Sequence, residues 1–232
     1  MNASQRRRHR CMCAIEDVLK LLRKKESPEE TLNSLQSRYL SPGGILESGY
    51  CSLSRESLTE PEALLLSLVP DLTRHCLSME YGLHPRLDRL SIASQYLRTL
   101  YIGITIEQFY LLCLDASGKL IERILLHKGS VDETPFYLAH VLQSITATDA
   151  SAIVLSHNHP GGSLRPSQAD ILCTVEALRA LQPLDVMMLD HIIIGNGQAI
   201  SLRNTGFIAA SIWADQAPSS ALLRNWIDVA QP

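Results

Sequence analysis

Apolar residues recur at helical spacing through the first third of the chain. The earliest such set is Ile15, Val18, Leu19 and Leu22. Because residues three and four positions apart lie on one face of a helix, this spacing predicts an amphipathic helix from residue 14 onward. The residues before it, 1–13, carry a basic run at 6–10, and we interpret them as a basic flexible tail.

The next segment begins with residues that are typical of a helix N-terminus. Ser27 can cap a helix, Pro28 suits the first helical position, and Glu30 completes a capping box. We expect the helix that follows to bury Leu32 and Leu35. This is the second helix of the N-terminal region.

The same capping pattern recurs at Thr59 and Glu62, ahead of a third apolar set. The residues that we expect this helix to bury are Leu64, Leu65, Leu68 and Leu72. Residues 14–80 are therefore predicted to form a small all-α domain. Residues 81–99 are interpreted as a linker that contains Gly82 and Pro85, followed by a connecting helix.

Beyond residue 100 the period of the apolar pattern changes. The predicted strands are 109–114, 120–126, 152–155, 186–194 and 198–202, and the predicted helices are 135–144 and 167–181. Strands that alternate with helices are typical of a mixed sheet covered by helices, so residues 100–208 are predicted to form an α/β domain. In the tail, 209–232, we expect a helix docked on either domain.

The composition limits the class of protein. A chain of 232 residues, of which 46% are hydrophobic, can form one well-buried domain and a smaller one. Its net charge of -3 gives no global attraction to nucleic acid. The six cysteines form no CxxC pair, which indicates reduced thiols in a cytoplasmic protein. No apolar run has the length of a membrane span, and no signal-peptide core follows the N-terminus, so we expect neither membrane insertion nor export.

Two histidines and an aspartate have the spacing of a metal site. His157 and His159 end an apolar run, and Asp170 follows early in the next predicted helix. Alternate residues of an extended segment point to the same side, so both imidazoles can bind one ion. Two imidazoles, one carboxylate and one open position for water are typical of catalytic rather than structural zinc.

Hydrolysis at such a site needs a proton acceptor and a donor for the developing oxyanion. Glu107, directly before a predicted strand, is our candidate for the base, and Glu122 and Glu133 are weaker choices. Ser167 has two compatible interpretations, a helix cap and a hydroxyl that donates to the oxyanion. His191 opens an apolar run and is interpreted as a core residue or as a support for the ligands.

The spacing of these residues resembles the JAMM (MPN+) metalloprotease motif, His-x-His-Pro followed by Ser-x-x-Asp and preceded by a glutamate. More closely, residues 156–160, 189–195 and 206–207 are similar to the RadC-like bacterial proteins that carry a JAB domain. This resemblance implies a cytidine-deaminase-like α-β-α sandwich that hydrolyses peptide or isopeptide amides. It also implies roles for five residues. His157, His159 and Asp170 would bind zinc, Glu107 would be the general base, and Ser167 would stabilise the oxyanion.

The chain departs from that family in three places. The Pro-Arg-Glu segment of RadC-like proteins appears here as Pro135, Phe136 and Tyr137. Gly161, Gly162 and Ser163 follow the proline, where RadC-like proteins usually have Ser-Gly-Asp. Residues 58–62 lack the glycine of a DNA-binding helix-hairpin-helix turn and include two glutamates, which does not favour direct DNA binding.

Two other functions can be compared with the zinc hydrolase. The alternative hypothesis is an accessory protein associated with DNA repair, in which the JAB domain is only a scaffold. A nucleobase deaminase is disfavoured, because the chain lacks the His-x-Glu and Pro-Cys-x-x-Cys signature of that class.

Overall fold

The computed structural model divides the chain into two compact units, Met1–Cys76 and Leu77–Pro232. It describes residues 3–23, 27–39, 42–129, 134–214 and 221–227. Within these ranges, no helix combines the length and the apolar content that crossing a membrane would require.

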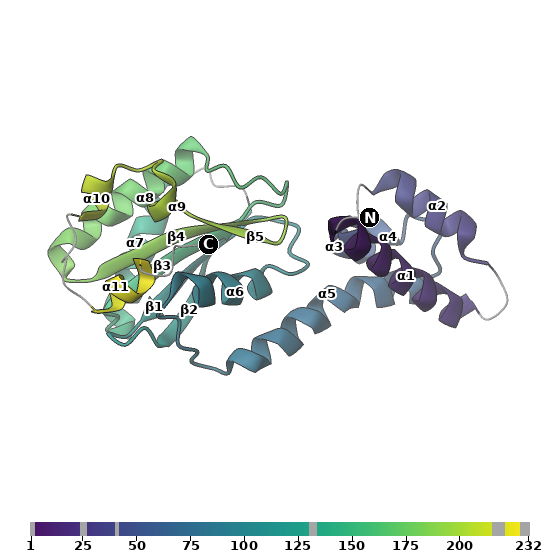
Figure 1. Ribbon diagram of the computed structural model, residues 1–232, viewed down its shortest axis with the longest axis horizontal. Helices are drawn as coiled ribbons and strands as arrows, with labels where there is room; N and C mark the ends of the chain where they lie inside the picture. The colour runs from purple at the N-terminus through teal and green to yellow at the C-terminus, as the bar shows by residue number, and fades with distance from the viewer. Residues whose placement is uncertain (1–2, 24–26, 40–41, 130–133, 215–220, 228–232) are drawn as a thin grey trace. The chain divides into compact units, whose positions relative to one another are not determined.

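The first unit is helical, as the sequence predicts (Figure 1). Its helices are α1 (Ala3–Arg23), α2 (Glu29–Arg38), α3 (Pro42–Glu47), α4 (Gly49–Leu53) and α5 (Glu60–Tyr81), which extends past the unit boundary. Their buried core contains Ile15, Leu19, Leu32, Leu35, Ile45, Leu53, Ala63 and Leu66. The apolar faces predicted for the first two helices are therefore largely the faces that pack.

Both of these helices begin at positions that differ from the sequence prediction. Helix α1 starts at Ala3, so residues 3–13 of the expected flexible tail belong to a helix, consistent with the high helix propensity of arginine and glutamine. The side chains of residues 6–10 lie outside the described part of the structure. The capping box expected at the start of α2 is not formed, because Pro28 occupies the N-cap and the Ser27 hydroxyl accepts from the Glu29 amide instead, at 3.4 Å.

The buried face of α5 is set by a charged residue. The Glu62 side chain is fully buried, where it accepts a hydrogen bond from Nη2 of Arg23 at 3.0 Å. It also accepts from the Thr59 amide at 2.7 Å, which is one half of the predicted capping box. A buried carboxylate must keep such partners, so it fixes the rotation of the helix.

The prediction for the buried face of α5 was therefore wrong. Ala63 and Leu66 pack inward on the side of Glu62, whereas Leu64, Leu68 and Leu72 have exposed fractions of 48%, 42% and 58%. A count of apolar residues alone selected the larger but incorrect stripe, because it gave no weight to a buried ion pair.

The second unit is built on one five-stranded sheet in the order β2-β1-β3-β4-β5. The strands are β1 (Gln108–Leu114), β2 (Leu120–Lys128), β3 (Ala152–Asn158), β4 (Met187–Gly195) and β5 (Gln198–Ser201). Only the β3–β4 pair is parallel, so the sheet is mixed. This confirms the predicted α/β class, with β3 at the centre.

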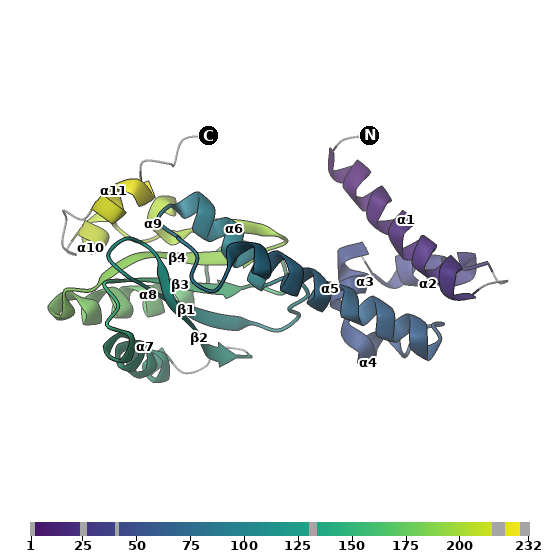
Figure 2. The ribbon, with the colours of Figure 1, turned by 90° about the horizontal axis from the view of Figure 1, so that it is seen from below.

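Helices cover both faces of this sheet (Figure 2). One face carries α7 (Thr134–Thr148), α8 (Gln168–Leu181) and α10 (Ala210–Ala214), and the other carries α6 (Leu90–Leu100) and α11 (Ala221–Ile227). A short 3-10 helix, Gln182–Leu184, follows α8, and α9 (Leu202–Thr205) follows β5. The result is the α-β-α sandwich that the sequence led us to expect.

The two described helices of the C-terminal tail, α10 and α11, pack against opposite faces of the sheet. Trp213 belongs to the core under α7 and α8, where the Arg203 guanidinium lies 4.3 Å from its ring centroid. Trp226 belongs to the opposite core, and its Nε1 donates to the buried Asp190 carboxylate at 3.2 Å. The tail is thus part of the second unit and not of the first.

Residues expected to form a linker are instead bound to the sheet. The Leu87 amide donates to the Gly118 carbonyl at 2.7 Å, and the Leu120 amide donates to the Pro85 carbonyl at 2.8 Å. Helix α6 then contributes buried residues to the second core. The α/β unit therefore begins well before residue 100.

The rotation of α5 can be tested with two leucines that differ in burial. Leu66 is 1% exposed and Leu68 is 42% exposed. We expect Leu66→Ala to lower the free energy of unfolding by about 2–5 kcal/mol, since it opens a cavity. We expect Leu68→Ala to change it by about 0.5 kcal/mol or less. Helical circular dichroism of the whole chain during denaturation measures both changes. Equal losses of unfolding free energy in the two variants would contradict the observed rotation of α5.

Candidate metal centre

The two histidines of the motif lie at the end of the central strand. His157 is the sixth residue of β3, is fully buried, and pairs with Phe109 of β1. His159 follows the strand and stays attached to the sheet, because its amide donates to the Ile194 carbonyl of β4 at 2.8 Å. The extended backbone turns both rings to one side, where their Nε2 atoms are 2.9 Å apart.

Asp170 approaches these rings from the first turn of α8. Its Oδ1 is 3.1 Å from Nε2 of His157, and its Oδ2 is 3.5 Å from Nε2 of His159. One ligand atom from each of the three residues can be chosen so that all lie within 4.8 Å of one another. The structure thus brings together the three residues that the sequence predicts as metal ligands.

The orientation of His159 suits metal binding. Its Nδ1 is 2.9 Å from the Ser163 carbonyl oxygen. A carbonyl only accepts hydrogen bonds, so Nδ1 carries the proton of the neutral ring. The lone pair is then on Nε2, which faces Asp170, and this is the arrangement in which a histidine binds zinc.

The charges at the site are strongly coupled. Burial disfavours the charged form of Asp170, but hydrogen bonds from Ser167, and from His157 and His159 when their Nε2 atoms are protonated, hold the pKa of its carboxyl well below the usual range. The hydrogen bond to Asp170 raises the pKa of His159 in spite of its burial. A fixed negative charge therefore faces two imidazole nitrogens, as expected of a site that attracts a cation.

Ser167 has the geometry of a helix cap. Its hydroxyl accepts from the Asp170 amide at 3.1 Å and donates to Oδ2 of Asp170 at 2.7 Å. The Ser167 amide donates to the same carboxylate oxygen at 2.6 Å, which completes a capping box. The cap interpretation is confirmed, and it fixes Asp170 on the helix; the oxyanion interpretation stays a prediction.

Glu107 lies immediately before β1, two residues ahead of Phe109, which pairs with His157. The charge of Glu107 contributes to the raised pKa of His159. The predicted base therefore influences one predicted ligand electrostatically from the segment just before β1.

Asn158, between the two histidines, holds the segment that carries Glu107. Its side-chain oxygen accepts from the Gln108 amide at 2.8 Å, and its nitrogen donates to the Ile106 carbonyl at 3.1 Å. Sequence reasoning missed this role. The available signal was the alternation of a strand, because a polar residue between two ligands must point to the opposite side.

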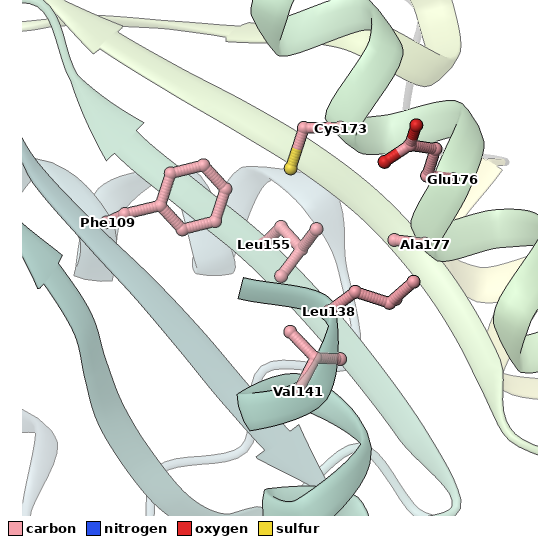
Figure 3. A pocket seen from close by; sticks show the side chains of 7 residues that line it. All are labelled: Phe109, Leu138, Val141, Leu155, Cys173, Glu176 and Ala177. Atoms are coloured by element: carbon pink, nitrogen blue, oxygen red, sulfur yellow. The ribbon is translucent and has the colours of Figure 1, made fainter. Parts of the chain in front are cut away.

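Phe109 separates the histidines from an apolar pocket. Its ring stacks on His157 with the centroids 5.3 Å apart and an interplanar angle of 5°. It also lines a pocket between the sheet and helices α7 and α8, together with Leu155 and Cys173 (Figure 3). Burial raises the pKa of the Cys173 thiol to about 12, so this thiol is neutral and contributes to an apolar wall.

The protein is thus an α-β-α sandwich in which two histidines at the end of the central strand face an aspartate from the first turn of α8. A family model for the RadC-like JAB domain matches residues 87–207, which include all five predicted site residues. The chain belongs to this family. It is 30% identical to a UPF0758 protein of Pseudomonas fluorescens over 79% of this chain and 82% of the relative. It is 32% identical to a UPF0758 protein of an Acidovorax species over 71% and 70%, respectively.

The turn that orients His159 is supported by a close contact with Gly195. A Cβ at position 195 would lie 2.6 Å from the Ser163 carbonyl oxygen, the acceptor for His159. We expect Gly195→Ala to displace this carbonyl and to weaken zinc binding by about 10-fold or more. Gly161→Ala is the matched control, because a Cβ there meets nothing within 4 Å. Competition with a chelator measures both affinities, and equal values would refute the role of this contact.

Proposed function

We propose that this protein is a zinc-dependent hydrolase that cleaves an amide bond in a peptide or protein substrate. The observation that carries the proposal is the convergence of His157, His159 and Asp170 on one side of the sheet. Three protein ligands leave a fourth position for water or substrate, as in catalytic zinc sites. Membership of the RadC-like JAB domain family supports the same conclusion.

The donor set suits zinc. Imidazole nitrogens and a carboxylate oxygen are among its common ligands, and Asp170 brings the negative charge that offsets part of the charge of the ion. When bound, zinc acidifies water and polarises a substrate carbonyl. The contribution of the protein is to present the two rings and the carboxylate in fixed orientations.

Glu107 is proposed as the general base. A carboxylate near the site can accept a proton from the attacking water and deliver it to the nitrogen of the leaving amine. Two features support this role. The charge of Glu107 contributes to the raised pKa of His159, and Asn158 holds the backbone on both sides of Glu107.

Ser167 is proposed as the donor to the oxyanion. Its hydroxyl proton is directed to Asp170, so this role requires the proton to turn from that carboxylate toward the substrate oxygen. A metal ion bound to Asp170 would make this carboxylate a weaker acceptor for the Ser167 proton. The Ser167 amide can remain bonded to Asp170 during this change, and the cap would therefore persist.

The experiment combines zinc analysis with a peptide-cleavage screen read by mass spectrometry. We expect about one zinc per chain in the wild type and little in Asp170→Ala. Glu107→Gln should keep its zinc and lose at least about 100-fold in rate, because it cannot accept a proton. Glu122→Gln, an exposed change on β2, is the matched control and should keep both.

One result would contradict the zinc-dependent function, and another would contradict the role of Glu107 alone. One is a folded wild type that binds no zinc when zinc is supplied. The other is a Glu107→Gln variant that cleaves substrate as fast as Glu122→Gln, which would exclude Glu107 as the base.

A further inference from the structure

A chain of buried polar groups leads away from the candidate metal centre. Nδ1 of His157 is 2.8 Å from Nε2 of His191, a fully buried residue of β4. Nδ1 of His191 is 2.7 Å from Oγ1 of Thr174, which is also fully buried. Oγ1 of Thr174 is in turn 2.6 Å from the carbonyl oxygen of Asp170, one helical turn earlier on α8.

The direction of each hydrogen bond follows from the last group in the chain. The Asp170 carbonyl can only accept, so the Thr174 hydroxyl donates its proton there. With that proton used, Thr174 must accept from His191, and Nδ1 of His191 therefore carries a proton.

The same reasoning fixes the tautomer of His157. His191 is fully buried, where a charged imidazole is costly, and its ring nitrogens lie at hydrogen-bond distance from His157 and Thr174, so we take the ring as neutral. A neutral His191 with its proton on Nδ1 accepts at Nε2, so Nδ1 of His157 must donate. The lone pair of His157 is then on Nε2, 3.1 Å from Asp170.

We propose that His191 and Thr174 are positioning residues that hold His157 in its metal-binding tautomer. Their hydrogen bonds start at His157 on β3 and end at the backbone of Asp170 on α8. Two of the three candidate ligands are thus joined by one chain of hydrogen bonds, although they come from different elements. Only the consequence for catalysis depends on the proposed function, because the tautomer is a property of the metal-free protein.

The neighbouring side chains limit the access of water to this chain of hydrogen bonds. The Phe109 ring stacks on His157 and lies 5.2 Å from the ring centroid of His191. An apolar ring beside two buried imidazoles limits the access of water, which could otherwise accept or donate in place of His191. The hydrogen-bond direction is therefore set by protein groups, with Thr174 as the residue that determines it.

Thr174 allows a sharp test with two substitutions. Thr174→Val keeps the shape of the side chain and removes the hydroxyl, whereas Thr174→Ser keeps the hydroxyl. Without an acceptor at position 174, the proton of His191 should move to Nε2 and the proton of His157 should move to Nε2 as well. That tautomer blocks the nitrogen that faces Asp170.

The first readout is nitrogen-15 NMR of the histidine rings in the metal-free protein at about pH 9, above the ordinary pKa of histidine. The wild type and Thr174→Ser should have the ring protons of His157 and His191 on Nδ1. Thr174→Val should show both on Nε2. A wild type with the His157 proton on Nε2 overturns the proposal, even if no variant folds.

The second readout is zinc affinity, measured by competition with a chelator beside the melting temperature of the metal-free protein. Thr174→Val should bind zinc about 10–100-fold more weakly than Thr174→Ser, as is usual when support for a ligand is lost. Equal affinities of these two variants would refute the positioning role. A wild type that binds zinc with the expected tautomers but cleaves no amide would overturn the proposed function alone.

Discussion

The structure depends on the need to satisfy a row of polar side chains buried in the central strand. Ser156, His157 and Asn158 all lie inside the protein at the end of β3. An unsatisfied buried polar group costs about 1–3 kcal/mol, so each must find a partner. Ser156 contacts the Tyr101 hydroxyl at 3.2 Å, and His157 and Asn158 bond to neighbouring strands. The partners fix the positions of the segments that surround the site.

This requirement connects the fold to the chemistry. The site lies at the carboxyl end of the parallel pair β3–β4, the end of parallel strands at which α/β proteins commonly bind ligands. Helix α8 begins there, and its capping box turns the Asp170 carboxylate toward the strand. On β4, Asp190 accepts from the Ser201 hydroxyl and from Trp226, so the strand that carries His191 is itself tied to the C-terminal helix.

The sequence predicts the α/β unit well because its signals are local. Alternating strands and helices, and a His-x-His pair followed by a capped helix with Asp170, each lie within a short segment. Features that depend on partners distant in sequence are harder to predict. The buried face of α5, which was predicted wrongly, depends on Arg23, 39 positions from Glu62, and the contact of His157 with His191 spans 34 positions. Neither contact can be predicted from the periodicity of apolar residues.

The most direct test of the account is X-ray absorption spectroscopy of the zinc-loaded protein. The account predicts nitrogen and oxygen neighbours at about 2.0–2.2 Å, with the multiple-scattering pattern of two imidazoles. It predicts no sulfur neighbour, although the chain contains six cysteines. A sulfur shell at about 2.3 Å, or the signature of fewer than two imidazoles, would contradict the assignment of His157, His159 and Asp170 as the zinc ligands.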